Sequence, residues 1–514
     1  MSESVPADVP AGAPTPEAAP ADAERRLHPM SWLFVLLQQL KQFIVPLLAL
    51  VVFGQGDADD SGYGYDSNLW PLIGVGVLAV VSVWQYFTYR YGVSGDTLVV
   101  RSGLFERSLR VIPFARIHNV ALQQSLLHRM VGVAEVRLES AGGKKPEAEM
   151  RVLKLEDALA LEALVRNRGT AAPAATVAEP AAAPLLSLNT GEVLRHGLVS
   201  NRGLILLAAA YGGMWQVPGL RGNLFEGWGE AVFGWAEGRQ FGPAQYALAA
   251  ISLLLLAVVV LRLLSMLMAL LQYHGFELRE HGRRLTVERG LLARWRTSAS
   301  RRRIQAWTLE EGVLHRLLKR RSLSVDTAVA EEEQNQQRAL RELAPIATPS
   351  ACDALIEHLL PASRWQSLAW QAQPASNWWR IWWPGALLAL AIAAAASWRV
   401  GAWAAIVLLW WPWSAFTAWQ HARRLAWSID DELVAVRGGW WSRHWRFAEI
   451  DKLQALQLTR NALDRRFGTA SLSFDTAGAG VLAPPLRIRF LPERVARDLQ
   501  DHVAATLARR PLKW

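Results

Sequence analysis

The sequence has very little cysteine and no familiar catalytic signature. Cys352 is the single cysteine among 514 residues, which excludes an internal disulfide framework and a four-cysteine metal site. The motifs HExxH, GxxxxGKS/T and GxSxG are absent, and the eleven histidines form no closely spaced set with the cysteine. We therefore predict no enzymatic activity and no catalytic, cofactor-binding or metal-binding residues.

Charged residues are nearly missing from the long apolar segments. Lys41 falls inside the first segment, and Arg262 directly follows 243–261, where the apolar sequence continues; neither has an obvious acidic partner in another such segment. Ionisable side chains within a membrane mark proton relays and transport pathways. Their scarcity counts against a transporter.

The apolar segments themselves lie in pairs. A helix of about 20 apolar residues spans the hydrocarbon core of a bilayer and satisfies its own backbone polar groups. The sequence predicts six spans, at 31–53, 70–88, 203–220, 243–261, 381–398 and 402–420, which form three hairpins. Because the hairpins repeat in one orientation, they differ from the inverted repeats common among transporters.

Charge indicates which way the hairpins point. The loop at 54–69 has four aspartates and no Lys or Arg, whereas the segment after each hairpin is rich in arginine. The positive-inside rule then places both termini and all three charged segments in the cytoplasm. This topology accounts for the net charge of +10 without a nucleic-acid partner.

Tryptophan is abundant, with 25 residues against 8 tyrosines. Trp378, Trp379, Trp382, Trp383 and Trp398 stand where interfacial aromatic belts are expected. A substrate-stacking role is an alternative for the deeper Trp410, Trp411 and Trp413.

One stretch of sequence occurs three times without gaps, at 101–141, 288–328 and 437–477. Glycines coincide in the three copies, as Gly103, Gly290 and Gly439. Alternating residues predict strands, then a short helical turn, then another strand, and a closing helix follows each copy. We expect each repeat to form a compact, mostly antiparallel sheet with one closing helix.

An arginine and an acid recur at fixed places in the repeat. Arg129, Arg316 and Arg465 are equivalent, and Glu139, Asp326 and Asp475 follow ten residues later. We predict that each arginine bridges its acid and pins the helical turn to the next strand. The alternative is two independently solvated charges. An exposed pair contributes at most about 1 kcal/mol, so the expected role is positional.

A further ionisable position recurs in the helical turn. His128 and His315 occupy it in the first two copies, and Asp464 occupies it in the third. Because the position does not keep one ionisable group, a place on the surface of the turn is favoured over a catalytic role.

The stretch "RSGLFERSLRVIPFARIHNVALQQSLLHRMVGVAEVRLESAGG", which begins at Arg101, resembles the bacterial pleckstrin-homology (PH) domain of the second type, also called the membrane-flanked domain. The segment "RLHPMSWLF" at 26–34 is similar to the start of YdbT-type membrane proteins, which carry several such domains between helix pairs. The second repeat departs from the pattern with Lys319, where the other copies have Gly132 and Gly468. The resemblance implies a split β-barrel closed by a C-terminal helix, and no known catalysis.

The same resemblance implies an envelope protein of the bacterial cytoplasmic (inner) membrane, with a link to antimicrobial-peptide resistance. It also implies a smaller companion membrane protein of the same domain type. Because a fold does not determine a function, these remain associations.

The predicted architecture is an α+β membrane protein in which each transmembrane hairpin is followed by a PH-like split barrel with a C-terminal helix. The hairpins are 31–88, 203–272 and 381–420, and the PH-like domains are 89–168, 273–361 and 421–510. A disordered tail at 1–24, an Ala/Pro linker at 169–188 and a linker at 362–380 complete the chain.

The predicted function is presentation of three cytoplasmic domains that bind lipid or protein. Basic clusters near a membrane attract anionic lipid headgroups with about 1 kcal/mol per Lys or Arg. The candidate contacts are Arg301, Arg302, Arg303, Lys319, Arg320, Arg321, Arg443 and Arg446. One alternative is that these charges only fix topology and solubility. The rival function is a membrane scaffold or a subunit of an export or transport complex.

Overall fold

The computed structural model describes residues 25–40, 69–94, 96–103, 108–140, 148–166, 183–216, 242–327, 340–478 and 483–510, together with Gly227 and Gly234. Its contacts divide the chain into two units. The first unit comprises 1–117, 127–139 and 146–176, and the second comprises 118–126, 140–145 and 177–514.

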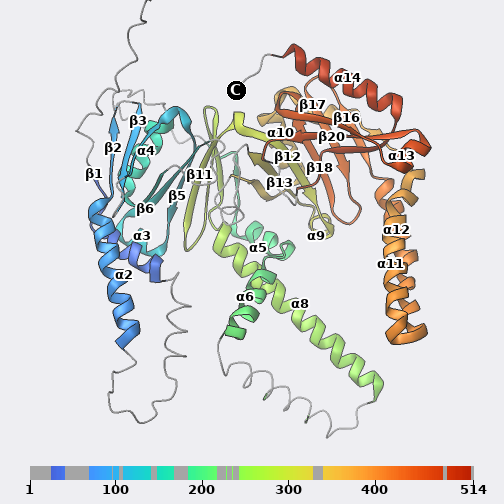
Figure 1. Cartoon of the computed structure of the whole chain (residues 1–514), viewed down its shortest axis with the longest axis horizontal. Coiled ribbons are helices and arrows are strands. Elements are labelled where there is room, and N and C mark those ends of the chain that lie inside the picture. Colours follow the sequence, from blue (N-terminus) through green and yellow to red (C-terminus); the bar gives the residue numbers. More distant parts are fainter. Residues whose placement is uncertain are drawn as a thin grey trace, which may run out of the picture. The chain divides into compact units, whose positions relative to one another are not determined.

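The first unit is built on a four-stranded antiparallel sheet in the order β1-β2-β3-β4. These strands are Arg25–Arg26, Arg90–Ser94, Thr97–Ser102 and Ser108–Pro113. A second antiparallel pair joins β6 (Val133–Ser140) to β7 (Ala148–Lys154), and helix α4 (Leu155–Arg166) follows (Figure 1). Leu98, Val136 and Met150 are fully buried, so the alternating apolar residues of the predicted strands do form a core.

The second repeat supplies two three-stranded layers around one core. β9 (Glu277–His281), β10 (Arg284–Arg289) and β11 (Arg294–Ser300) form the first layer. A turn of 3-10 helix leads to β12 (Ile304–Glu311), helix α9 (Val313–Leu317), β13 (Arg321–Thr327), β14 (Glu342–Ala347) and the closing helix α10 (Pro349–Leu359). Side chains from both layers and from α10, among them Leu285, Leu323 and Ile356, belong to one buried cluster.

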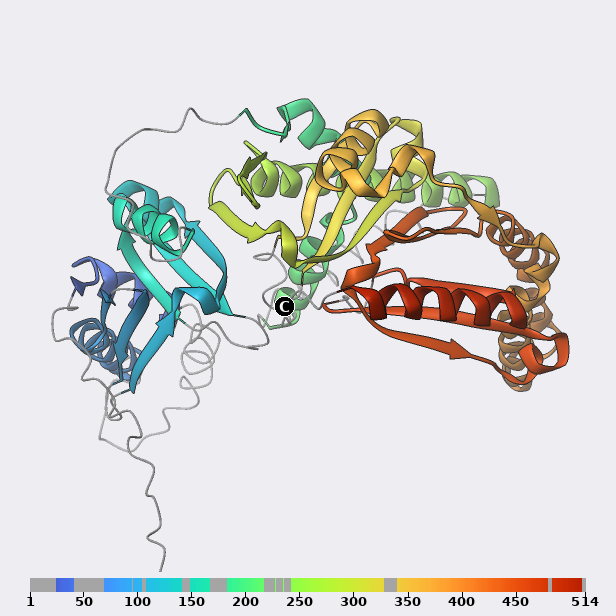
Figure 2. The same ribbon diagram turned by 90° about the horizontal axis from the view of Figure 1, so that it is seen from above.

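The third repeat has the same element order. Its strands are β16 (Ala426–Ile429), β17 (Leu433–Gly438), β18 (Arg443–Glu449), β19 (Leu453–Thr459), β20 (Thr469–Thr476) and β21 (Arg487–Pro492). Helix α13 (Ala462–Phe467) is the short turn, and α14 (Glu493–Arg509), red in Figure 2, lies along the β19–β21 sheet. Ala496 and Val503 of α14 are buried in the core of this repeat. The predicted sequence of strands, turn and closing helix is therefore present in each copy.

Each repeat also has a short strand that precedes its helices. β1, β8 (Leu186–Ser187) and β15 (Gln371–Ala372) pair antiparallel with β2, β9 and β16, respectively. The chain thus leaves the sheet, passes through the apolar segments and returns to the neighbouring strand. The repeat that is visible in the sequence begins after each hairpin, and this strand cannot be recognised there, because two residues are too few to show a period.

The sequence leaves open whether the repeats pack together, and in the second unit their sheets are joined. There β12 of the second repeat pairs with β18 of the third, which gives a seven-stranded sheet in the order β14-β13-β12-β18-β17-β16-β15. β5 (Ile117–Gln124), from the first repeat, pairs in the same way with β11 of the second. Successive repeats therefore share sheets, since a barrel that is split leaves strand edges open to another strand.

Two of the described helices are long and apolar enough to cross a membrane, at Pro243–Tyr273 and Ala375–Arg399. Helix α8 (Pro243–Tyr273) is the longest, and leucines along its middle, such as Leu253 and Leu255, are exposed. A large exposed apolar surface of this kind marks contact with lipid or with another protein.

The remaining predicted spans are only partly described. Shorter apolar helices occur at Ser31–Leu40, Gly74–Thr88 and Gly203–Gly213, and 41–53 and 217–220 lie outside the described residues. The predicted span 402–420 begins as 3-10 helix (Gly401–Leu409) and continues as α12 (Trp410–Ala422). Three complete transmembrane hairpins are therefore not confirmed.

Helices of each predicted pair nevertheless contact each other where both are described. The Ser82 hydroxyl donates to the Gln39 side chain over 2.8 Å, and the backbone N–H of Gly203 donates to Ser265 over 2.9 Å. In the third pair, Trp382 of α11 (Trp378–Val400) donates its indole N–H to Ser414 of α12 over 2.9 Å.

Candidate functional site: an inter-repeat junction and a tryptophan-lined groove

The junction between the second and third repeats is closed by large side chains. Trp307 of β12 stands opposite Phe447 of β18, and their rings are parallel within 4° with centroids 6.2 Å apart. Both side chains are fully buried. Phe447 belongs to the core cluster of the second repeat, so that core extends across the boundary between the repeats.

A buried ion pair lies on the other face of the same strands. The guanidinium of Arg446 donates to Thr308 Oγ1 over 2.8 Å and to Asp326 Oδ2 over 2.5 Å. The side chains of Arg446 and Asp326 are only 3% and 8% exposed. A buried charge is tolerated when it is paired and hydrogen-bonded, and this pair joins β18 to the second repeat.

In the second and third copies, the structure does not bring the predicted repeat pairs together. Asp326 accepts from Arg446 instead of Arg316, whose side chain donates to the Trp441 carbonyl over 3.2 Å. Within the described part of the chain, no ion pair joins Arg465 to Asp475. The side chain of Glu139, the expected partner of Arg129, lies outside the described residues. The acid at the second-repeat position thus faces the next repeat, because β12 has a neighbour that the sequence does not reveal.

Most of the other predicted lipid contacts are engaged within the protein. Arg301 donates to the Leu359 carbonyl and lies 3.6 Å from Glu280. Arg320 makes a two-pronged ion pair with Glu192, over 2.7 and 2.9 Å. This pair holds the pKa of the Glu192 carboxyl below its ordinary value, chiefly through the Arg320 hydrogen bond.

Two further basic side chains make contacts between the second and third repeats. Arg321 lies 4.9 Å from the centre of the Trp445 ring, and Arg443 lies 3.3 Å from Glu311. Burial, followed by the nearby Arg284, lowers the pKa of the Arg303 guanidinium. These arginines serve the structure of the second repeat and its junction with the third.

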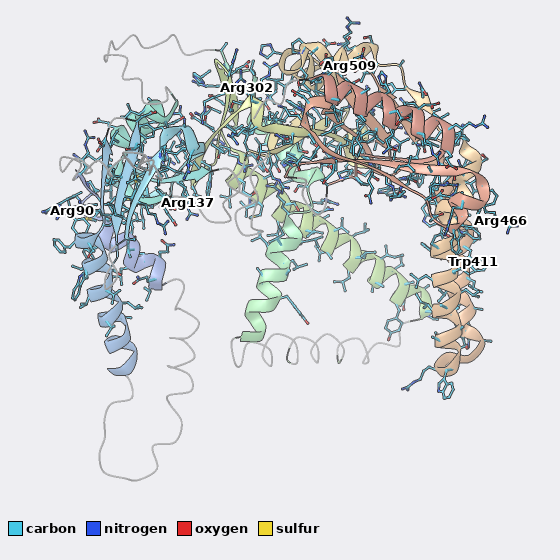
Figure 3. All side chains as sticks on the ribbon, turned by 45° about the horizontal axis from the view of Figure 1, so that its top comes forward. Arg90, Arg137, Arg302, Trp411, Arg466 and Arg509 are labelled. Carbon is cyan, nitrogen blue, oxygen red and sulfur yellow. The ribbon has the colours of Figure 1, made fainter. Side chains whose placement is uncertain are left out.

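Arg302 and Lys319 are the exposed members of the predicted set. Figure 3 labels Arg302, which lies in the turn between β11 and β12. Lys319 has a φ of 52°, in the left-handed region that Gly132 and Gly468 occupy at 70° and 62°. The departure at Lys319 therefore changes the residue without changing the backbone.

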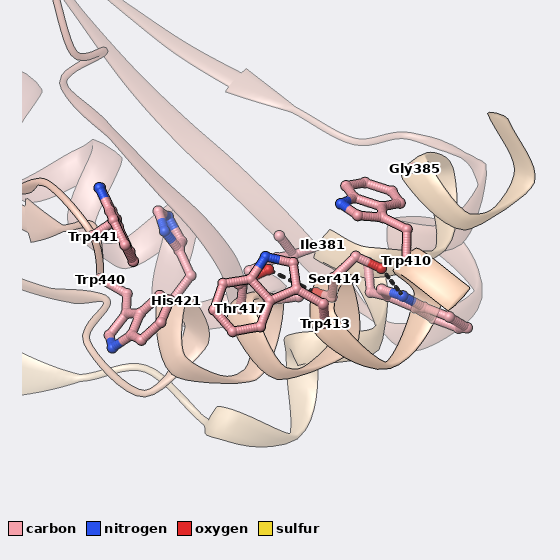
Figure 4. A pocket seen from close by; sticks show the side chains of 11 residues that line it. Ile381, Gly385, Trp410, Trp413, Ser414, Thr417, His421, Trp440 and Trp441 are labelled. Atoms are coloured by element: carbon pink, nitrogen blue, oxygen red, sulfur yellow. Dashed lines mark hydrogen bonds between the residues drawn. The ribbon is translucent and has the colours of Figure 1, made fainter. Parts of the chain in front are cut away.

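A tryptophan-lined groove lies where α11 and α12 meet the turn between β17 and β18. Its volume is about 590 Å³, and Figure 4 shows the side chains that line it. Indoles dominate the lining: Trp382, Trp410, Trp413, Trp440 and Trp441, with Ile381, Thr417 and His421 between them. Such a concave, largely apolar surface with a few polar groups is typical of a ligand site.

The indoles of the groove are held by one another. The Trp440 ring packs edge-on against Phe416, Trp413 and Trp441, with centroids 5.4 to 6.0 Å apart. Trp382 is fixed by its hydrogen bond to Ser414. A stacking role is the alternative prediction for Trp410, Trp411 and Trp413, and Trp410 and Trp413 line the groove. The sequence does not indicate that the turn between β17 and β18 completes it.

A buried arginine anchors the third helix pair to its domain. Arg380 of α11 donates to Asp464 of α13 and, over 2.9 Å, to the Thr469 hydroxyl. Asp464 is buried, so its expected place on the surface of the turn is wrong. The pKa of its carboxyl is lowered, because hydrogen bonds from Asn461, Thr469 and Arg380 outweigh burial. The sequence signal for this anchor was a lone arginine in "NWWRIWW".

The residues with nucleophilic or ligating potential are dispersed or buried. Cys352 is fully buried on α10, and burial raises the pKa of its thiol to about 12. Among the described residues, no group of three or more His, Cys, Asp or Glu side chains could hold a metal ion.

Comparison with known proteins agrees with this architecture. The chain matches the Bacterial PH domain family at residues 35–169, 232–351 and 386–507, which together make up most of its length. It is 21% identical over 337 residues to the UPF0699 transmembrane protein YdbT of Bacillus subtilis strain 168, and the match covers 63% of this chain. The match spans 66% of the length of that relative. No solved structure matches. Three domain matches over one chain, each with the same order of strands and closing helix, place this protein in the Bacterial PH domain family.

Proposed function

We propose that this chain is a non-enzymatic, multi-pass protein of the bacterial inner membrane, whose PH-like domains bind anionic lipid at the cytoplasmic leaflet. The tryptophan-lined groove is the observation that carries the proposal, because it lies where the apolar helices α11 and α12 meet the third PH-like domain. Indole rings are favoured at that depth of a membrane. The apolar lining suits an acyl chain.

Arginines at the end of α12 supply the charge for a headgroup. Arg423 and Arg424 directly follow α12, and Arg316 donates to the backbone of Trp441 in the groove. Burial and the nearby Arg443 and Arg316 lower the pKa of the Arg424 guanidinium. Glu311 is the acid that opposes this effect. A bound anion lowers the electrostatic repulsion among neighbouring arginines, so a phosphate-bearing headgroup suits this position.

Lipid retention tests this site directly. The full chain is purified in mild detergent, exchanged into vesicle-derived phosphatidylglycerol and phosphatidylcholine mixtures, and bound lipid is measured by mass spectrometry. Arg424→Gln should reduce retained phosphatidylglycerol roughly five-fold, as expected for about 1 kcal/mol per arginine. Arg302→Gln, which removes an equally basic exposed side chain elsewhere, is the matched control.

The groove and the arginines are separable in this experiment. Trp410→Ala should lower retention of both lipids, because it removes apolar lining without changing charge. Unchanged phosphatidylglycerol in Arg424→Gln, with a loss in Arg302→Gln, would move the lipid site to the second repeat and reject this proposal.

The proposed topology has its own test. Cysteines introduced as Arg302→Cys and Lys319→Cys lie at exposed positions, and the native Cys352 is buried. An impermeant maleimide should label both only after the membrane is opened. Labelling of either position in intact cells would overturn the cytoplasmic placement. A role in envelope defence, and a smaller companion protein, stay predictions drawn from the resemblance.

A further inference from the structure

The two junctions between repeats use one register. Val120 pairs with Ser298 in the first junction, and the equivalent Trp307 pairs with Phe447 in the second. The neighbouring pairs are equivalent too, with Ala121 opposite Thr297 and Thr308 opposite Arg446. In both junctions, the strand that follows the 3-10 turn of one repeat (β5 or β12) pairs with the equivalent strand of the next repeat (β11 or β18) in the same register.

Among the described strands, this pattern leaves one open strand edge at each end of the series of repeats. β4 is equivalent to β11 and β18, and it stands at the end of its sheet. Among the described strands none pairs with its outer edge. Val111 of β4 is 51% exposed, whereas the equivalent Ser298 and Phe447 are 4% and 0% exposed. Leu109 is likewise half exposed.

β19 is the complementary strand at the other end. It is equivalent to β5 and β12 and stands at the end of the β19-β20-β21 sheet, with no partner on its outer edge in the part of the chain that the structure describes. Ala455 and Gln457 are exposed, although the equivalent Ala306 and Thr308 are buried beneath the next repeat. Leu456 and Leu458 are only partly buried.

The charges at the two ends also match those of the internal junction. Arg110 of β4 is equivalent to Arg446, and Asp475 of β20 is equivalent to Asp326. Arg446 and Asp326 form the buried ion pair across the β12–β18 junction. Asp475 and Arg110 are both exposed to solvent.

We propose that β19 of one copy of this chain pairs with β4 of a second copy, in the register of the two internal junctions. Leu456 then stands opposite Val111, Leu458 opposite Leu109 and Gln457 opposite Arg110. Arg110 of one copy meets Asp475 of the other. The repeated acid that the sequence singles out thus has one role in the second and third repeats: it receives an arginine from the following repeat, within the chain or from the next chain.

A second copy is the favoured occupant because both halves of the junction exist on this one chain. Open strand edges are aggregation liabilities unless another strand covers them. The apolar residues of the two edges fall opposite one another in this register, as Trp307 and Phe447 do inside the chain. The contact joins unlike surfaces, so it generates rings or linear arrays of chains.

Disulfide mapping in native membranes tests both the partner and the register. Two differently tagged full-length chains are co-expressed, one carrying Val111→Cys and the other Leu456→Cys. Residues directly opposite in antiparallel strands have Cβ atoms about 4.5 to 5.5 Å apart. Mild oxidation should therefore give a disulfide-linked dimer that contains both tags.

Two controls define the result. Gln457→Cys places the thiol on the opposite face of β19, and Val495→Cys places it on exposed α14. Each should cross-link to Val111→Cys at least roughly ten-fold less, because antiparallel side chains alternate between faces. Equal yields from all three would show random collision and overturn the proposal. A chain that carries both Val111→Cys and Leu456→Cys serves as a further control. If the disulfide forms only within that chain, or if Val111→Cys cross-links only to a different protein, the proposal is overturned.

Charge exchange supplies an independent readout. Arg110→Asp and Asp475→Arg should each reduce the dimer yield, and combining Arg110→Asp in one chain with Asp475→Arg in the other should restore it. Loss of a buried charge pair across an interface typically weakens association roughly 30-fold or more. Asp498→Arg, an exposed acid on α14, is the control and should leave the yield unchanged. Failure of the exchange to restore the yield would reject the Arg110–Asp475 contact, and size-exclusion profiles would confirm that each variant is folded.

Discussion

The two inter-repeat junctions share a backbone alignment and differ in what fills it. At β12–β18, Trp307 stacks on Phe447 and Arg446 is buried against Asp326. At β5–β11, the equivalent positions are Val120 opposite Ser298. The register therefore does not depend on the stacked rings or the buried ion pair, because both junctions have the register and the Trp307–Phe447 and Arg446–Asp326 contacts belong to β12–β18.

A repeated glycine explains why β11 and β18 enter their junctions with the same backbone geometry. Gly290 and Gly439 precede β11 and β18 with φ of 113° and 79°. A Cβ atom at these positions would lie 1.9 Å from the Ala293 carbonyl oxygen and 1.8 Å from that of Ser442. Only glycine fits this turn without displacing the backbone, so the turn geometry is common to both junctions and the side chains decide their strength.

Removing the buried arginine should produce the largest difference between the junctions. Arg446→Ala leaves Asp326 buried without its partner, which should cost about 3–5 kcal/mol of local stability. Thr297→Ala changes the equivalent residue in the other junction and should cost about 1 kcal/mol. Native-state hydrogen exchange of β12 and β5 in nanodiscs measures both. Similar losses would show that the ion pair does not distinguish the junctions.

The stacked tryptophan should rank next. Trp307→Ala opens a cavity against Phe447 and should destabilise the β12–β18 junction by about 3–5 kcal/mol, at the low end if the core relaxes. Val120→Ala removes less volume and should cost less in its own junction. The same exchange measurement applies, and a greater loss from Val120→Ala would contradict the ranking of the two cores.

The junctions should respond differently to acid. Burial, followed by the nearby His421 and Arg446, lowers the pKa of His444, whereas the equivalent residue in the other junction is Trp295. A histidine with a lowered folded pKa contributes stability that is complete above its unfolded pKa of about 6.5 and is lost as pH falls through the folded pKa. Protection of β18 amides should fall below pH 6.5.

Glu310, opposite His444, acts in the other sense. Burial raises its pKa, so its contribution is complete below its unfolded pKa and declines as pH rises through the folded pKa. His444→Gln isolates the histidine effect and should flatten the acid response of β18 relative to wild type. An unchanged response in His444→Gln would assign it to another buried group.

The smallest effect on stability is expected for the partly exposed ion pair at the margin of the β12–β18 junction. Arg443 lies 3.3 Å from Glu311 across the β12–β18 junction, and its side chain is 30% exposed. Arg443→Gln should therefore cost less than about 1 kcal/mol of stability, while it lowers phosphatidylglycerol retention as Arg424→Gln does. A thermal shift assay and the lipid measurement separate these effects. A large loss of stability without loss of lipid would make Arg443 structural.

Sequence periodicity predicted the elements of each repeat well. The alternating residues of "RLTVERG" and the capping Thr348 before Pro349 appear as β10 and the start of α10, where Thr348 accepts from the Ala351 N–H over 3.3 Å. These features depend on neighbours within a few residues, so they can be read from the chain directly.

The partners of the charged residues could not be read in the same way. Asp326 and Arg446 are 120 residues apart, and the pattern around Asp326 offered Arg316 as the nearer candidate. Arg380 and Asp464 are likewise distant in sequence and joined in space. A pairing of this kind depends on which strand edge meets which, and hydrophobic alternation gives the faces of a strand but not its neighbour.

The amino-acid sequence by itself determined the threefold repeat, the order of strands and helices within it, and the apolar segments beside it. Local steric preference and side-chain periodicity suffice for these. Only the tertiary structure decided that successive repeats share sheets, that Asp326 pairs with an arginine of the next repeat, and that a turn between two strands completes a groove on two helices. The sharing of sheets depends on backbone hydrogen bonds between strand edges. Most sequences can form such bonds, and the packing of the folded chain determines which edges meet.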